Sequence, residues 1–420
     1  MDRFAPFEPC PRLALALSGG PDSMALLALS RDWVAARDGE LLALIVDHGL
    51  RPGSAAEATR VAGWAEALGV QAEILRWRGE KPMTRIQERA REARYALLRA
   101  ACRRAGILHL LTAHHREDLA ETVALRKARG SGPIGLAGMA AERFFEELRL
   151  LRPLLPVPRD RLLATLRAHR LPRLLDPSNL DPRFARARLR RTGPLPVAEL
   201  LAGAAAAARS RRSLEGELAR FCARHLRAHP LGLIEMEAAA WRRLAPELAE
   251  LVLERALLVA GGGRQPPRRA ALARLAAVLR RPGPIRRTLA GCIVEARDDR
   301  LRIGREPGRL APPACCGPGE TLLWDRRWRL ENRSPRPVTL LPLARLPDPG
   351  RRRRLAARAG AAGLPAWYAA GLPLVLEEGR PLGWPLAAAG LAARRLRLLL
   401  APARRLVDSP FAGILVSTFR

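Results

Sequence analysis

The sequence predicts an α/β fold: a twisted parallel sheet with helices on both faces, followed by a helical domain and a small α+β C-terminal domain. Three observations support this prediction. Apolar strand patterns alternate with helical patterns over residues 13–191, helical spacing of Ala, Leu, Arg and Glu dominates residues 197–281, and short segments punctuated by proline fill residues 320–420. In parallel sheets of the first kind, ligands bind at the carboxyl ends of the strands.

Four strands are predicted in the first part, at residues 13–17, 41–46, 71–77 and 107–112, with helices between them and over residues 84–104. Residues 193–196 predict a domain boundary, and residues 287–303 predict a hairpin that turns near Asp298 and Asp299. The Pro- and Gly-rich residues 311–319 predict a linker, after which helical periodicity returns only near residues 351–359 and 387–400. We therefore divide the chain into residues 1–193, 197–310 and 320–420.

The charge of the chain favours a polyanionic partner. The 420 residues include 73 Lys and Arg against 41 Asp and Glu, a formal net charge of +32. Lysine occurs only at Lys81 and Lys127; a GC-rich genome would explain the preference for arginine but not the excess of positive charge. RNA, DNA and anionic membranes would all attract such a chain. We interpret the excess of positive charge as an indication of a nucleic-acid partner.

Other sequence features indicate a cytoplasmic protein that does not enter a membrane. The N-terminus lacks the basic and apolar regions of a signal peptide, and no apolar run reaches the length of a membrane span. The six cysteines form no Cys-x-x-Cys pair, so we expect reduced thiols and neither a disulfide framework nor a zinc site.

The most specific signal is SGGPDS at residues 18–23, between a predicted strand and a predicted helix. Glycines let backbone N–H groups approach phosphate oxygens, and the helix presents its unpaired N–H groups to the same anion. Ser18 and Ser23 add hydroxyl donors, whereas Asp22 would repel a bare phosphate and so indicates a Mg²⁺ between them. The spacing is not that of a Walker A loop, and an ordinary strand–helix turn is the alternative.

Polar residues also follow the second predicted strand. Asp47 could accept from an amine or a hydroxyl or support a metal, and His48 lies beside it. Arg51 could bind a phosphate. A simple Asp-His-Gly turn with a surface arginine is the alternative. On the helix predicted over residues 84–104, Arg91 shares a face with residues 94 and 95, an arginine and a tyrosine. A solvated basic face would explain that spacing equally well.

A denser cluster follows the fourth predicted strand. His114 and His115 are adjacent and cannot both point the same way on a regular element, so one role each is favoured over joint metal ligation. Asp118 and Glu121 are three residues apart and lie on one helical face, where a pair of carboxylates could hold an ammonium group. Acidic residues that favour a helix N-terminus are the alternative.

Two further segments are compatible with RNA or nucleotide contact. Residues 129–139 form a glycine-rich loop, which a plain connector would also explain. Residues 176–181, DPSNLD, lead into a basic helix with arginines at positions 183, 186, 188, 190 and 191. We expect this helix to pack back on the site and to contact RNA.

Together these stretches resemble one family, tRNA(Ile)-lysidine synthetase of the PP-loop ATP pyrophosphatase superfamily. The shared motifs stand in family order as SGGPDS, VDHGLR at residues 46–51, ARxxRY at 90–95, TAHHREDLAET at 112–122, RGSG…GLAGM at 129–139, RPLL at 152–155 and DPSNLD at 176–181. Fainter likenesses follow at residues 288–292, and at 364–368 and 372–375, which resemble the family's C-terminal tRNA-binding domain.

The resemblance implies an adenine nucleotide alpha hydrolase-like fold and an ATP-dependent ligase. In this family ATP adenylates the wobble cytidine of the CAU anticodon of tRNA(Ile), pyrophosphate leaves, and the amine of free L-lysine displaces AMP to form lysidine. ATP as co-substrate, Mg²⁺, free L-lysine and tRNA(Ile) are therefore the expected partners. A homodimer is compatible with the sequence.

The resemblance also implies roles for particular residues. The catalytic candidates are Asp22, Arg91, Asp118 and Glu121, of which Asp22 and Asp118 are also the candidates for Mg²⁺. The candidates for binding the nucleotide are Ser18, Gly19, Gly20, Pro21, Asp22, Ser23, Asp47, His48, His114 and His115.

The chain departs from the family pattern at three positions, and other functions remain alternatives. Glu117 stands where the family has Asp, Leu119 where it has Gln, and Ala187 where it has Asn. A PP-loop enzyme that thiolates tRNA bases is the first alternative, although such enzymes use cysteine pairs or Fe–S cysteines. A small-molecule ligase that uses this loop is a second alternative, but the chain shows no glutaminase cysteine–histidine set. A non-catalytic RNA-binding protein is a third, against which the intact acidic positions argue.

Overall fold

The computed structural model describes residues 1–79, 81, 86–145, 148–174, 185–383, 396–402 and 406–407. The chain forms two compact units, Met1–Ser213 and Leu214–Arg420. They divide within the long helix α8 (Val197–His225), and the sequence-based division into three domains stays a prediction.

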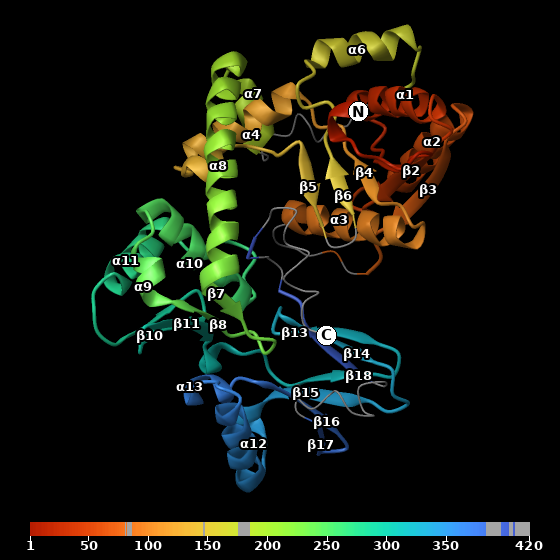
Figure 1. Ribbon diagram of the computed structural model, residues 1–420. Coiled ribbons are helices and arrows are strands. Elements are labelled where there is room, and N and C mark those ends of the chain that lie inside the picture. The colour runs from red at the N-terminus through yellow and green to blue at the C-terminus, as the bar shows by residue number, and fades with distance from the viewer. Residues whose placement is uncertain are drawn as a thin grey trace. The chain divides into compact units, whose positions relative to one another are not determined.

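The first unit is built on a six-stranded sheet with strand order β3-β2-β1-β4-β6-β5, in which only β5 runs antiparallel (Figure 1). The strands are β1 (Arg12–Ala16), β2 (Glu40–Asp47), β3 (Gln71–Arg76), β4 (His109–Leu111), β5 (Glu142–Phe144) and β6 (Arg149–Leu151). The helices are α1 (Pro21–Ala35), α2 (Ser54–Ala67), α3 (Ile86–Arg104), α4 (Arg116–Ala128), α5 (Pro133–Leu136), α6 (Arg159–Ala168) and α7 (Ala185–Arg191). The four predicted strands are confirmed as β1–β4.

Alternation along the strands sends side chains into two cores, one on each face of the sheet. Leu13 and Leu15 of β1 join a buried cluster with residues of α1, α2 and α6. Ala14 and Ala16 instead join a second cluster, to which α3 contributes Leu98. The predicted layering, with helices on both faces, is therefore confirmed, and α1 and α3 lie on opposite faces of the sheet (Figure 1).

The second unit combines helices with three antiparallel sheets. Their strand orders are β7-β8-β11-β10-β9, β12-β15-β16-β17 and β13-β14-β18. The strands are β7 (Leu226–Ala228), β8 (Ile234–Glu237), β9 (Ile285–Leu289), β10 (Cys292–Arg297), β11 (Arg300–Arg305), β12 (Ala314–Cys316), β13 (Thr321–Trp324), β14 (Trp328–Asn332), β15 (Val338–Pro342), β16 (Pro373–Glu377), β17 (Arg380–Gly383) and β18 (Leu396–Leu400). The helices are α9 (Ala238–Arg242), α10 (Pro246–Gly261), α11 (Arg269–Leu279), α12 (Pro349–Ala361) and α13 (Ala366–Ala369).

The second unit corrects three sequence-based expectations. The predicted hairpin is present as β10 and β11, but β7 and β8 interrupt the stretch interpreted as wholly helical. The predicted linker contains β12, which pairs with β15. The described end of the helical pattern at residues 387–400 is the strand β18, because its residues pair along β14.

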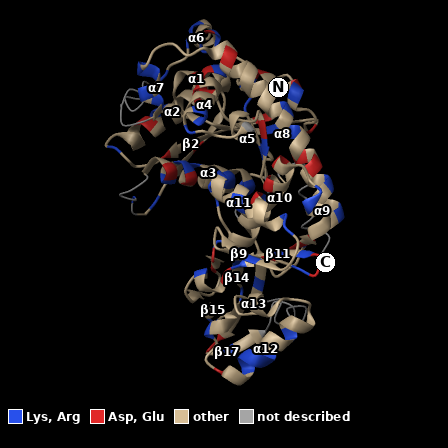
Figure 2. Cartoon of the chain, turned by 90° about the vertical axis from the view of Figure 1, so that its left-hand side faces the viewer, with Lys and Arg blue, Asp and Glu red and all other residues tan. Residues whose placement is uncertain are grey.

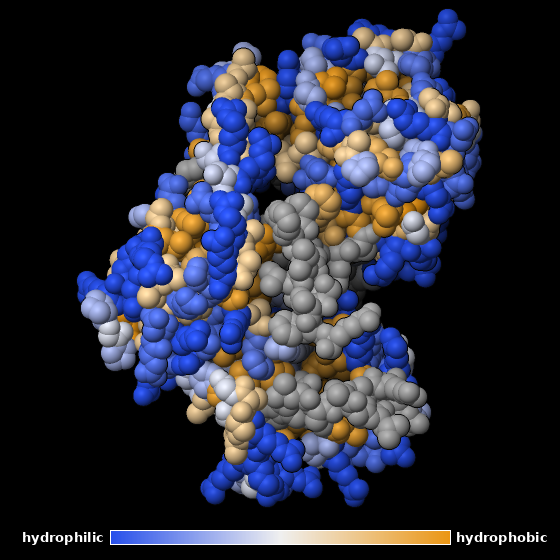
Figure 3. All heavy atoms as spheres, viewed as in Figure 1, coloured by the Kyte–Doolittle hydropathy of each residue, from blue (hydrophilic) through white to orange (hydrophobic). Residues whose placement is uncertain are grey.

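Positive charge gathers on exposed helices of this unit. Figure 2 shows a group of Lys and Arg on α12, whose sequence carries four consecutive arginines at residues 351–354 and another at Arg358. Hydrophilic residues gather at the exposed end of α12 and alternate with apolar residues along α8 (Figure 3). Within the part of the chain that the structure describes, no helix combines the length and apolar character needed to cross a membrane.

Candidate active site

Several of the candidate site residues meet where the strand order reverses. From β1 the chain proceeds to β2 and β3 on one side, whereas β4 pairs with β1 on the other. In open parallel sheets this switch point leaves a crevice at the carboxyl ends of the two strands. Residues 18–23 follow β1 and residues 112–118 follow β4, so two of the motifs found in the sequence face the same crevice.

The loop after β1 is shaped by Gly19 and the two serines. Gly19 has a φ of +76°, and a Cβ at this position would lie 2.4 Å from Val61 Cγ2, so only glycine fits here without displacing a neighbour. The Ser18 backbone N–H donates to Ser23 Oγ at 3.3 Å, and Ser23 Oγ donates to the Gly20 carbonyl at 2.9 Å. Gly20 is the N-cap of α1 and Pro21 its first residue.

Asp22 and Asp118 converge on one histidine. His115 Nε2 lies 3.7 Å from Asp22 Oδ2 and 3.5 Å from Asp118 Oδ2, and the His115 side chain is buried. Burial raises the pKa of Asp22, and the charge of Asp118 adds to this, while His115 and Arg159 act in the opposite direction. The structure thus brings together both candidates for Mg²⁺.

One carboxylate oxygen of Asp22 has no hydrogen-bond partner. Asp22 Oδ1 is buried without a hydrogen-bond partner among the described residues, and Arg159 Nε lies 4.0 Å from it. No group of three or more His, Cys, Asp or Glu side chains in the described ranges could hold a metal alone. Mg²⁺ commonly takes one or two protein carboxylates and completes its shell with water and substrate phosphates, so this pair fits the ion.

His114 lies among arginines. Burial lowers the pKa of His114 to about 3, and the charges of Arg152, Arg91 and Arg94 contribute to the shift. Its Nδ1 is 3.1 Å from Thr112 Oγ1. A neutral imidazole surrounded by guanidinium groups suits an anionic ligand, to which it can donate a hydrogen bond without carrying charge.

The acidic residues of α4 are paired with α7. Arg190 Nε donates to Glu121 Oε1 at 2.6 Å and its Nη2 to Oε2 at 3.2 Å, and Arg186 Nη1 donates to Asp118 Oδ1 at 3.4 Å. The hydrogen bond to Glu121 raises the pKa of Arg190. The expectation that the basic helix packs back on the site is therefore confirmed. The arrangement also shows that Asp118 and Glu121 can both accept from a cation.

Asp47 and His48 lie at the neighbouring strand end and make fewer contacts with the others. Asp47 Oδ1 accepts from the Gly49 backbone N–H at 2.9 Å, as in a simple turn. Burial lowers the pKa of His48, and the charge of Arg94 contributes to this shift. Arg51 forms a bidentate pair with Glu57, so its guanidinium is engaged away from the nucleotide candidates.

Comparison with known proteins agrees with this geometry. A family model described as a PP-loop domain matches residues 2–193. A curated tRNA(Ile)-lysidine synthase from Methylobacterium sp. (strain 4-46) is 42% identical over 312 residues, which cover 71% of this chain and 90% of that protein. The protein of the same name from Rhodopseudomonas palustris is 42% identical, covering 73% and 94%. That from Ruegeria pomeroyi is 36% identical over 389 residues, covering 90% and 87%.

The chain belongs to the tRNA(Ile)-lysidine synthase family. This membership confirms the PP-loop fold that the motifs indicated.

The three departures from the family pattern are accommodated locally. Glu117 accepts from the Arg159 backbone N–H at 3.0 Å and lies 3.0 Å from His115 Nδ1, so its longer side chain helps to orient this ring. Leu119 packs in a small apolar cluster between α4 and residues 195–204. Ala187 is buried on the inner side of α7, where a small residue fits.

Two arginines at the candidate site of this lysidine synthase family member were not among the predicted site residues. Arg152 was noted only as part of a motif, yet it is buried and influences His114. Arg159 was not singled out, although it faces Asp22 from the start of α6. The position of arginine in the RPLL motif was the available signal for Arg152, whereas nothing local marked Arg159. The DPSNLD motif lies outside the described residues.

Proposed function

We propose that this protein uses ATP to join free L-lysine to the wobble cytidine of the CAU anticodon of tRNA(Ile), forming lysidine and releasing AMP and pyrophosphate. The observation that carries the proposal is the meeting of a phosphate-binding loop and a cation-accepting acidic pair at one switch point. Membership of a family whose curated members are named tRNA(Ile)-lysidine synthase supports it.

The loop after β1 and the residues around His114 are proposed to bind the triphosphate. The backbone N–H groups of residues 19 and 20, the hydroxyl of Ser18 and the start of α1 at Pro21 offer donors to phosphate oxygens. The hydroxyl of Ser23, which donates to the Gly20 carbonyl, would join them by turning toward the phosphate. His114 and His115, with Asp47 and His48 at the adjacent strand end, complete the nucleotide-binding set. Arg91 contributes positive charge near His114, where the α-phosphate and the activated base would need it.

Asp22 and Asp118 are proposed to hold Mg²⁺. The support is the unpartnered Oδ1 of Asp22 and the approach of both carboxylates to His115. When bound, the ion neutralises negative charge on the departing pyrophosphate. The protein's part is to fix the two carboxylates through His115, and to keep Asp22 desolvated so that it binds cations strongly.

Asp118 and Glu121 are proposed to hold the ammonium group of lysine. They already accept hydrogen bonds from Arg186 and Arg190, which are cations of similar reach. Lysine attacks only as a free amine, so a carboxylate that orients it and accepts its proton assists the second step. Lysine therefore has to replace at least one of these arginines.

The positive charge outside the catalytic unit is proposed to bind the tRNA. Salt-dependent contacts with phosphates would come from arginines such as those of α12, while recognition of the correct tRNA requires base contacts. In this proposal residues 197–310 and 320–420 serve tRNA binding, and residues 1–193 catalysis. Sedimentation of the full chain tests whether it acts as a homodimer.

Two substitutions test the division of roles. E121Q should raise the KM for lysine while leaving ATP–pyrophosphate exchange, measured with the tRNA(Ile) transcript present, close to wild type. The control is E66Q, which makes the same change at an exposed glutamate of α2. An unchanged KM for lysine in E121Q would contradict the proposed lysine contact.

A further inference from the structure

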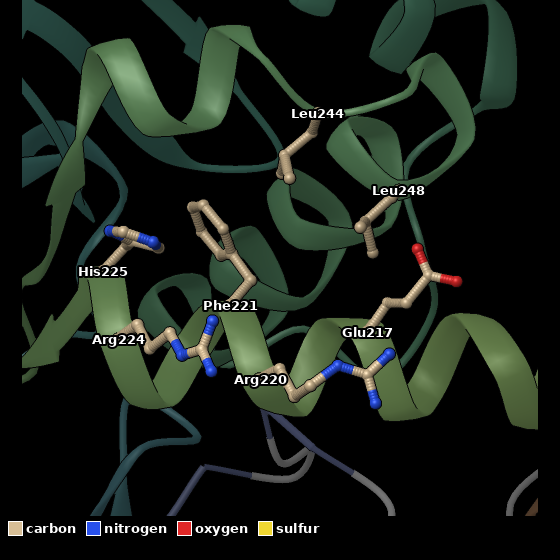
Figure 4. A pocket seen from close by; sticks show the side chains of 7 residues that line it. All are labelled: Glu217, Arg220, Phe221, Arg224, His225, Leu244 and Leu248. Atoms are coloured by element: carbon tan, nitrogen blue, oxygen red, sulfur yellow. The ribbon is translucent and has the colours of Figure 1, made fainter.

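A pocket outside the catalytic unit is not used by any step described above. It has a volume of about 240 Å³ and lies in the second unit, between α8 and the segment leading into α10 (Figure 4). Its lining residues are Glu217, Arg220, Phe221, Arg224, His225, Leu244 and Leu248. Pockets for drug-sized ligands range from about 300 to 1,000 Å³, so this one suits a single ring system.

The interior of the pocket is apolar and contains two rings. Phe221, Leu244 and Leu248 point toward its centre (Figure 4). The rings of Phe221 and His225 have centroids 5.4 Å apart and planes tilted by 39°. His225 Nδ1 lies 3.1 Å from Glu237 Oε2, and this contact with β8 holds the ring in place. The pocket therefore offers a preformed apolar and aromatic surface for a planar ring.

The edge of the pocket carries positive charge. Arg220 and Arg224 are exposed and lie one helical turn apart on α8, and neither forms an ion pair with another described residue. Glu217 lies at the opposite end of the pocket from His225 (Figure 4). A shallow, open apolar surface with two cations beside it matches a nucleotide, because the base of a nucleotide has apolar faces and its backbone is anionic.

We propose that this pocket binds one unstacked nucleotide of the RNA substrate, with its base against Phe221 and His225 and its neighbouring phosphates on Arg220 and Arg224. Proteins recognise RNA sequence mainly through bases turned out of the stack onto aromatic side chains. The identity of the RNA as tRNA(Ile) rests on the proposed function.

Binding of the tRNA(Ile) transcript to the full chain, measured over a series of salt concentrations, separates the two parts of the proposal. The double variant R220Q/R224Q should lower the salt slope by about 1.4, because each phosphate contact on single-stranded RNA contributes about 0.7. L244Q removes no charge and should weaken binding about tenfold with an unchanged slope, as expected for loss of base stacking.

The control is R227Q, which removes an exposed arginine of β7 outside the pocket. A slope in R220Q/R224Q equal to that of wild type would overturn the phosphate contacts. Binding by L244Q within twofold of wild type would overturn the base contact and leave an electrostatic patch only.

Crosslinking of the wild-type protein gives a readout that does not depend on the folding of any variant. Ultraviolet crosslinks from the transcript should fall on the peptide that contains Phe221 and His225. Crosslinks in the second unit that all fall outside residues 217–248 would overturn the proposal. Lysine incorporation by the same wild-type preparation tests the proposed function separately. If the protein bound the transcript without incorporating lysine, the crosslinks would still test whether the pocket binds a base.

Discussion

Removing Arg190 should make lysine bind more tightly. In the free protein its guanidinium makes two hydrogen bonds to Glu121, at 2.6 and 3.2 Å, and lysine must displace it to reach this carboxylate. In R190Q the carboxylate, whose side chain is only 6% exposed, would lose both of these hydrogen bonds and keep a longer ion pair with Arg186 Nε, at 3.8 Å, until lysine arrives. The energy that lysine now spends on displacement would then appear as affinity.

The expected size follows from the surroundings of the pair. Hydrogen bonds to charged groups contribute about 1.5–3 kcal/mol when buried, whereas exposed ion pairs contribute about 0–1 kcal/mol. The Arg190 side chain is 40% exposed, so we take about 1 kcal/mol, which corresponds to about a fivefold lower KM for lysine.

The assay is lysidine formation at saturating ATP and tRNA(Ile) with lysine varied. R191Q is the control, because it removes the neighbouring positive charge from the same helix. A KM for lysine that is unchanged or raised in R190Q would show that Arg190 does not compete with lysine, and would refute this reasoning.

Three further predictions concern the nucleotide side of the site. G19A should destabilise the protein by at least about 1 kcal/mol in chemical denaturation and impair ATP–pyrophosphate exchange. The reason is that Gly19 has a φ of +76° and that a Cβ there would meet Val61. G20A is the control and should be tolerated better, because its Cβ would meet only Ser18 Oγ, at 3.6 Å. D22N should slow the exchange about a hundredfold or more, because the metal it is proposed to hold stabilises charge worth several kcal/mol, and the surface variant D32N should not. Burial lowers the pKa of His114 to about 3, so below about pH 6.5 the unfolded chain takes up a proton that the folded chain refuses. The free energy of unfolding should therefore fall as the pH drops from about 6.5 toward 3, by at most about 1.4 kcal/mol per pH unit. In thermal denaturation, H114Q should lose less stability over this pH range than the wild type. An equal loss in both proteins would contradict the lowered pKa of His114.

The first unit was predictable because its signals are strong and local. Strands buried on both faces read as continuous apolar runs, and β1, β2 and β4 each end in polar residues that sit at the same sheet edge. The loop at residues 18–23 combines glycines, hydroxyls and a carboxylate between a buried strand and a helix. These local signals are enough to predict the fold and the place of the candidate site.

What the sequence left open depends on short elements and long-range pairing. The strands β7 and β8 have three and four residues, too few for alternation to stand out inside an arginine- and leucine-rich stretch. The contacts of Arg190 with Glu121 and of Arg159 with Asp22 join residues far apart in the chain, so spacing could not reveal them. The lowered pKa of His114 likewise depends on burial in the folded chain, with a smaller contribution from arginines distant in sequence.

Incorporation of radiolabelled lysine into a transcript of the CAU-anticodon isoleucine tRNA, with ATP and Mg²⁺, tests the central claim most directly. The elongator methionine tRNA, which has the same anticodon, is the control. The account predicts label in the isoleucine tRNA only. ATP–pyrophosphate exchange without any label would contradict the proposed nucleophile or RNA, and equal label in both tRNAs would contradict the proposed discrimination.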